Sequence, residues 1–170
     1  MEEHGVRIIK MPAYRLALVN TVSNSPEMAS IQRLMKWVAE KNLADREYGQ
    51  RWFGSNNPPP QEGKAEYGYD AMVTIPDDII ADDEVQLFEI PEQTCAVIKA
   101  NLQNITQMWN YLYDWVSGSE YEIADHGLEE LLDPYANDVE FLFNLWLPVR
   151  KQSNSKSENY DKPIRLQEQP

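Results

Sequence analysis

The sequence has few residues of the kinds that build covalent, metal or phosphate sites. Its 170 residues include one cysteine, Cys95, which excludes an internal disulfide and a zinc site made of several thiolates. The two histidines, His4 and His126, have no second ligand at metal-binding spacing, so we expect no metal site. The seven glycines are scattered and form no phosphate-binding loop, which argues against nucleotide chemistry. We therefore expect no metal and no cofactor.

Positive charge and long apolar runs are also scarce. The 15 basic residues face 28 acidic ones, and a net charge of −13 repels nucleic acid and anionic membrane surfaces. The strongest apolar stretch, 141–149, is interrupted by Asn144 and Pro148 and is too short to cross a bilayer. No basic segment leads into an apolar run near Met1. We expect a cytoplasmic, single-domain protein without direct nucleic-acid or membrane partners.

An internal repeat is the most informative feature that the sequence does contain. Ile8-Ile9-Lys10-Met11-Pro12 aligns with Leu87-Phe88-Glu89-Ile90-Pro91, and the two prolines stand 79 residues apart (91 − 12 = 79). At the same offset residues 17–19 align with residues 96–98, all six of which are apolar. The matched segments indicate two copies of one structural unit.

Each copy has the pattern of a strand, a helix and two further strands. The first helix is predicted to have its cap at Ser25 and Pro26 at its first position, and to end near Asn42. The second helix carries an apolar stripe from Ile105 to Val116. Short strands are predicted at 51–55, 69–75, 127–132 and 141–148. The segment 127–132 contains strong helix formers, but the repeat requires a strand there.

The predicted fold is α+β. It consists of tandem βαββ repeats at about 6–78 and 85–149, related by a pseudo-twofold axis, with an antiparallel sheet and both helices on one face. This domain spans residues 1–150, and residues 151–170 form a polar tail.

A candidate binding surface follows from strand alternation. Trp146 points away from Phe143 and Leu145, which places it on the sheet face without helices. Leu128 and Leu132 mark the core face of their strand, so Glu129 is expected on the open face beside Trp146. A carboxylate among aromatic rings is poorly solvated, and a bound cation would relieve that cost. The alternative is that Glu129 is solvated and that most of the aromatic residues are core.

Several motifs, taken in order, resemble those of a known family. They are Phe53-Gly54-Ser55-Asn56-Asn57-Pro58, Glu66-Tyr67-Gly68-Tyr69-Asp70, Ile90-Pro91, Gly127-Leu128-Glu129 and Leu145-Trp146-Leu147-Pro148-Val149. The chain resembles the GyrI-like small-molecule-binding family, the effector-binding domain of AraC-type and MerR-type bacterial transcription regulators. The resemblance implies a ligand groove between two βαββ halves, with Glu129 facing the ligand. Because no helix-turn-helix pattern precedes residue 6, we expect a stand-alone member.

Three functions remain open from the sequence. The leading hypothesis is a protein that senses or sequesters small hydrophobic, cationic aromatic compounds. Its expected ligand-binding residues are Glu129, Trp146, Phe53, Tyr67, Tyr69 and Trp109. The second is a hydrolase of cyclopropane-containing cytotoxic compounds, in which Glu129 activates water and Tyr69 polarises the substrate. The third is an acidic interaction module with a protein partner or a second copy of the chain.

Overall fold

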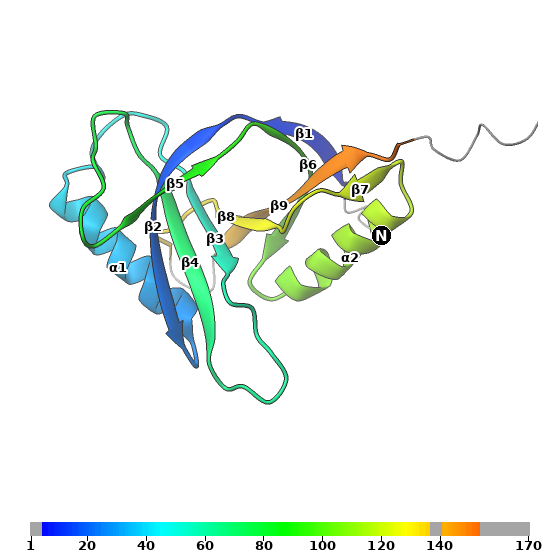
Figure 1. The fold of residues 1–170 in the computed structure, drawn as a ribbon, viewed down its shortest axis with the longest axis horizontal. Coiled ribbons are helices and arrows are strands. Elements are labelled where there is room, and N and C mark those ends of the chain that lie inside the picture. The colour runs from blue at the N-terminus through cyan, green and yellow to red at the C-terminus, as the bar shows by residue number, and fades with distance from the viewer. Residues whose placement is uncertain (1–4, 137–140, 154–170) are drawn as a thin grey trace, which may run out of the picture.

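A computed structural model describes residues 5–136 and 141–153 (Figure 1). These residues form two helices and a sheet of nine strands. In chain order the elements are β1 (Arg7–Met11), β2 (Tyr14–Ser23), α1 (Pro26–Glu40), β3 (Trp52–Asn56), β4 (Tyr67–Thr74), β5 (Gln86–Ile90), β6 (Gln93–Asn101), α2 (Ile105–Ser117), β7 (Tyr121–Ile123), β8 (Leu128–Leu131) and β9 (Leu142–Lys151). The predicted α+β class is confirmed. β9 extends into the predicted tail as far as Lys151, and the tail from residue 154 onward lies outside the described residues.

The strand order confirms the predicted duplication. The order is β1-β6-β9-β8-β3-β4-β2-β5, and β7 is attached to β9. Read from the two edges toward the middle, β1 corresponds to β5, β6 to β2, β9 to β4 and β8 to β3. The pseudo-twofold axis therefore passes between β3 and β8. β1 pairs with β6 and β5 pairs with β2, so each repeat lends its outermost strand to the other repeat.

Both helices pack on the same face of the sheet, as predicted. α1 buries Ile31, Leu34 and Val38, which recur at helical spacing, and α2 buries Met108 and Leu112 in the same apolar cluster. Figure 1 shows α1 and α2 at opposite ends of the molecule, with β3 and β8 between them. In the described part of the chain, no helix has the length and apolar character needed to cross a membrane.

The short element β8 is a strand, as the repeat predicts and local propensity does not. It pairs antiparallel with β3 on one side and with β9 on the other. Hydrogen bonding along both edges offsets the helix preference of its Leu-Glu-Glu-Leu sequence, because propensities differ by less than about 1 kcal/mol per residue.

The sheet face without helices is also packed, and this corrects one prediction. Trp146 lies on this face, as expected, but only 5% of its surface is exposed, whereas we expected an exposed ring. It belongs to a second apolar cluster with side chains from β1, β2, β5 and β6. The sheet curls in Figure 1, which brings side chains from strands near both edges together over this face. Both faces of the sheet therefore contribute to the core.

Candidate functional site

Glu129 lies on the helix face of β8, opposite to the predicted side. Its neighbour on the same face, Leu131, belongs to the cluster under the helices, whereas Leu128 belongs to the cluster around Trp146. The prediction that Glu129 and Trp146 share a face is therefore wrong. It relied on Leu132 as a core residue, but β8 ends at Leu131 and Leu132 is 43% exposed.

Two aromatic donors hold the Glu129 carboxylate. The Tyr69 hydroxyl donates to Oε2 at 3.2 Å, and the Trp109 indole Nε1 donates to Oε1 at 3.3 Å. Tyr69 comes from β4 in the first repeat and Trp109 from α2 in the second. The structure thus brings together three of the six predicted ligand-binding residues at the junction of the two halves.

The electrostatic surroundings of Glu129 disfavour its ionised form. Burial raises the pKa of this carboxyl above its ordinary value of 4.5, and the charge of Glu27 adds to the increase, while the hydrogen bonds from Trp109 and Tyr69 partly offset it. Burial, followed by the Glu129 charge, also raises the pKa of Tyr69 well above 10. Among the described residues, no lysine or arginine contributes to the pKa shift of Glu129. Within residues 5–136 and 141–153, Glu129 is therefore a desolvated carboxylate with no lysine or arginine partner.

Two glycines provide the space that these donors need. Gly54 is paired with Glu129 across β3 and β8, and a Cβ at Gly54 would lie 1.8 Å from the Tyr69 hydroxyl oxygen. A Cβ at Gly127 would lie 2.3 Å from the Trp109 ring. A side chain at either position would displace one of the donors to Glu129. The glycine motifs of the sequence therefore have a direct structural role at this site.

Two cavities open on either side of Glu129, and this residue lines both. The larger, of about 510 Å³, is lined by Ser55, Asn56, Asn57, Pro59, Trp109, Tyr113, His126, Gly127 and Glu129. The smaller, of about 280 Å³, is lined by Glu27, Met28, Ile31, Tyr69, Leu102, Ile105, Glu129, Leu131, Phe141 and Phe143. None of these lining residues is lysine or arginine. Each cavity is lined by residues of both repeats, and we call the two cavities together the groove.

Tyr67 lies next to the groove rather than on Glu129. It points to the same side of β4 as Tyr69, and its hydroxyl donates to Glu27 Oε1 at 2.8 Å. That hydrogen bond raises the pKa of Tyr67. Sequence reasoning treated Glu27 only as part of a helix start. Because Tyr67 and Tyr69 alternate along one strand, their hydroxyls point to the same face of the sheet. This spacing could have indicated two hydrogen-bond acceptors on that face.

The remaining predicted residues, Trp146 and Phe53, belong to a separate cluster on the helix-free face. Arg51 forms an ion pair there with the buried Glu130, and Trp146 Nε1 donates to Glu130 Oε2 at 3.1 Å. The Arg51 guanidinium lies 5.4 Å from the Phe53 ring centroid and 5.5 Å from that of Trp146. These rings already face an internal cation and cannot meet a ligand that contacts Glu129 on the other face.

The described residues offer neither a metal-binding cluster nor a reactive thiol at the groove. Within the described ranges, no three His, Cys, Asp or Glu side chains are placed to hold a metal ion. Cys95 is buried in the helix-free cluster, and burial raises the pKa of its thiol to about 12.

The comparison with protein families agrees with the duplicated fold and the groove. Residues 4–150 match the model of the GyrI-like small molecule binding domain. The chain belongs to this family. It is therefore a GyrI-like domain of the small-molecule-binding type, and the match spans both repeats. None of the proteins of curated function is detectably similar to this GyrI-like chain in sequence.

Solved structures share the GyrI-like fold at low sequence identity. The C-terminal domain of EcmrR has a TM-score of 0.67 and 13% identity, covering 88% of this chain and 99% of that domain. EcmrR in its DNA complex has a TM-score of 0.66 and 14% sequence identity, and the match covers 87% of this chain. The chain spans 58% of the length of that EcmrR chain. A hydrolase from Listeria innocua has a TM-score of 0.61 and 12% sequence identity, and the match covers 86% of this chain and 92% of the hydrolase. SAV2435, solved bound to tetraphenylphosphonium, gives 0.52 and 12%, covering 86% and 94%.

Proposed function

We propose that this GyrI-like domain binds amphipathic organic cations, in order to sense or sequester them, with the cationic centre next to Glu129. One observation carries the proposal: Glu129 is a desolvated carboxylate between two cavities whose described lining contains no lysine or arginine. A cation beside it would stabilise the ionised form, and the apolar part of the ligand would fill the groove.

The rest of the groove and the whole molecule favour the same ligand chemistry. Trp109 and Tyr113 lie side by side on α2 with ring centroids 5.9 Å apart, which provides an aromatic wall for a flat or lipophilic cation. The net charge of −13 attracts cations over longer distances. The structural relative SAV2435 was solved with tetraphenylphosphonium, a lipophilic cation, which adds support.

Replacement of Glu129 by glutamine tests the proposal. The E129Q variant keeps the shape of the side chain and removes the charge, so we expect tetraphenylphosphonium to bind roughly tenfold or more weakly, since the loss of one partner of a desolvated pair costs a few kcal/mol. Calorimetric titration gives the dissociation constants. The E47Q variant makes the same change in net charge at an exposed position after α1 and should bind like wild type. Equal affinities in wild type and E129Q would refute the role of Glu129.

A hydrolase is the second candidate, favoured by the hydroxyl of Tyr69 next to the Glu129 carboxylate. The Listeria innocua hydrolase of the same fold makes this candidate relevant. Against it, both carboxylate oxygens already accept hydrogen bonds from Tyr69 and Trp109, so a water molecule would have to share an oxygen that is already engaged. The two functions are separated by incubating the protein with a cyclopropane-containing electrophile. A water-added product that E129Q does not form would establish the hydrolase, and binding without product would establish the binding function.

A further inference from the structure

The groove consists of two unlike chambers that share Glu129 alone among their lining residues. We call the larger cavity the polar chamber, because Asn56, Asn57 and His126 line it, and the smaller one the apolar chamber. The apolar chamber is surrounded mainly by Met28, Ile31, Leu102, Ile105, Leu131, Phe141 and Phe143. A ligand whose charge lies at Glu129 is therefore next to both chambers.

The hydrogen bonds to Glu129 divide in the same way. Trp109 lines the polar chamber and donates to Oε1, while Tyr69 lines the apolar chamber and donates to Oε2. Each chamber thus holds a different oxygen of the carboxylate through its own donor. A cationic centre can interact with the carboxylate from between the two donors while its substituents extend in both directions.

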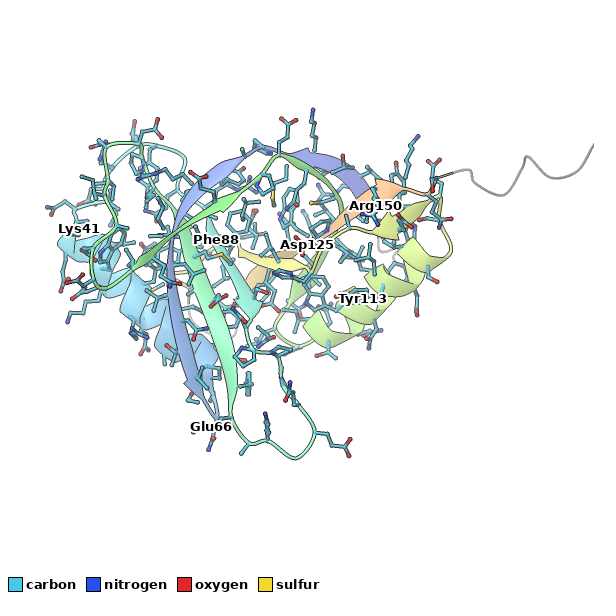
Figure 2. The ribbon with its side chains drawn as sticks, viewed as in Figure 1. Lys41, Glu66, Phe88, Tyr113, Asp125 and Arg150 are labelled. Carbon is cyan, nitrogen blue, oxygen red and sulfur yellow. The ribbon has the colours of Figure 1, made fainter. Side chains whose placement is uncertain are left out.

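The two linings call for different substituents. The apolar chamber offers mainly aliphatic and phenyl surface, which suits a hydrocarbon ring. Its polar lining groups are the Glu27 and Glu129 carboxylates and the Tyr69 hydroxyl, and each of them already takes part in a hydrogen bond. The polar chamber is lined by asparagine amides, an imidazole and the rings of Trp109 and Tyr113, and Figure 2 shows Tyr113 on α2. These groups can hydrogen-bond to an amide or ester and also cover an aromatic ring.

We propose that the ligand of this domain is a two-armed cation. Its ammonium-type centre lies at Glu129, a hydrocarbon arm fills the apolar chamber, and an arm bearing an amide-like group fills the polar chamber. This inference rests on the proposed function and adds the ligand class. Once one arm is bound, the second arm enters its chamber without a further loss of translational freedom. A ligand with both arms should therefore bind more tightly than a ligand with either arm alone.

Three quaternary ammonium ions that differ only in their arms test the inference. Denatonium has a diethylammonium centre with a benzyl arm and a dimethylanilide arm. Benzyltriethylammonium keeps only the benzyl arm, and N-ethyl-lidocaine keeps only the anilide arm. We expect denatonium to bind about tenfold or more tightly than either one-armed ion, because each arm buries a ring. Calorimetric titration of the full chain supplies the three dissociation constants.

Bulky substitutions that fill one chamber make the test specific. Met28 is 37% exposed at the apolar chamber, and His126 is exposed at the polar chamber, so tryptophan at either position can be accommodated without disturbing the core. M28W blocks the apolar chamber and should make denatonium bind no more tightly than N-ethyl-lidocaine, which has no benzyl arm. H126W blocks the polar chamber and should make denatonium bind no more tightly than benzyltriethylammonium, which has no anilide arm. Each substitution should leave the ion that lacks the blocked arm within about twofold of its wild-type affinity. L102W and P59W, at exposed lining positions of the same two chambers, repeat the test if either variant fails to fold.

The outcomes separate this inference from the proposed function. If denatonium binds no more tightly than the better one-armed ion, or if M28W and H126W weaken both one-armed ions equally, the two-armed inference is wrong. If benzyltriethylammonium binds E129Q as well as it binds wild type, the proposed cation site itself is wrong. Chamber-specific losses together with a loss of all three ions in E129Q would support both.

Discussion

Glu129 and Glu130 are adjacent on β8, yet their carboxylates lie on opposite faces of the sheet in opposite surroundings. Glu130 is buried and is paired with Arg51, and it also accepts a hydrogen bond from Trp146. Glu129 accepts hydrogen bonds from neutral donors, and neither lysine nor arginine is among the described residues that line its groove. The Glu130–Arg51 ion pair stabilises the fold, whereas the Glu129 carboxylate faces a cavity with no lysine or arginine among the described residues to stabilise its ionised form.

Glutamine substitutions at these two positions should therefore affect stability in opposite ways. E130Q leaves Arg51 without its anionic partner and should lower the free energy of unfolding by about 1–3 kcal/mol, a range reduced because Arg51 is partly exposed. E129Q removes a desolvated charge and should leave stability unchanged or slightly increased. Urea denaturation near neutral pH measures both, with E47Q as the reference. A larger loss in E129Q than in E130Q would contradict the assignment of the two faces.

At the scale of secondary structure, the pairing of β3 with β8 decides whether Tyr69 can reach Glu129. G54A should displace the tyrosine, because its Cβ would lie 1.8 Å from the hydroxyl oxygen, and should destabilise the protein by about 1–3 kcal/mol. Combined with Y69A, which removes the ring, G54A should cost much less than it does alone. The double-mutant cycle is measured by urea denaturation, with G5A as a control in open space. Additive effects would show that the two residues do not compete for the same space.

The elements also show how far the sequence could predict this molecule. Matched prolines and apolar segments revealed the repeats, and the repeat correctly assigned β8 as a strand. The predicted face of Glu129 was wrong because the prediction from leucine alternation allowed only one core face. In the structure both faces are packed, and Glu130 is buried on the helix-free face in its ion pair with Arg51. That pair joins residues 79 positions apart, and nothing in the local pattern of either segment indicates it.

The candidate site was predictable in its central residues and not in its walls. Glu129, Tyr69 and Trp109 were expected from the sequence and do meet. The cavity-lining residues Glu27 and Phe141 were not expected there, because their place depends on how α1 and the start of β9 sit against β8. Relations of that kind are set by tertiary packing rather than by local periodicity.

At the scale of the whole molecule, the exchange of outer strands makes the two repeats one folding unit. β1 completes the sheet of the second repeat and β5 that of the first, so neither half has its own complete sheet. We expect a single cooperative unfolding transition in urea, with coincident curves from tryptophan fluorescence and far-ultraviolet circular dichroism. Two separated transitions would contradict the interlocked arrangement.

Glu129 also makes cation binding by the whole domain dependent on pH. Because its pKa in the folded protein lies above 4.5, the carboxylate becomes neutral as the pH falls through that raised value. The affinity for a permanent cation should decrease over the same range. By linkage, a bound cation must lower the pKa of Glu129.

The most direct test of the account is the pKa of the Glu129 carboxyl, measured by carbon NMR with and without tetraphenylphosphonium. E129Q identifies the signal by its loss. We predict a pKa above 4.5 in the free protein and a clear decrease when the cation is bound. A pKa at or below 4.5 in the free protein, or a value that does not change with bound cation, would contradict the claim that Glu129 is the cation-binding centre of the groove.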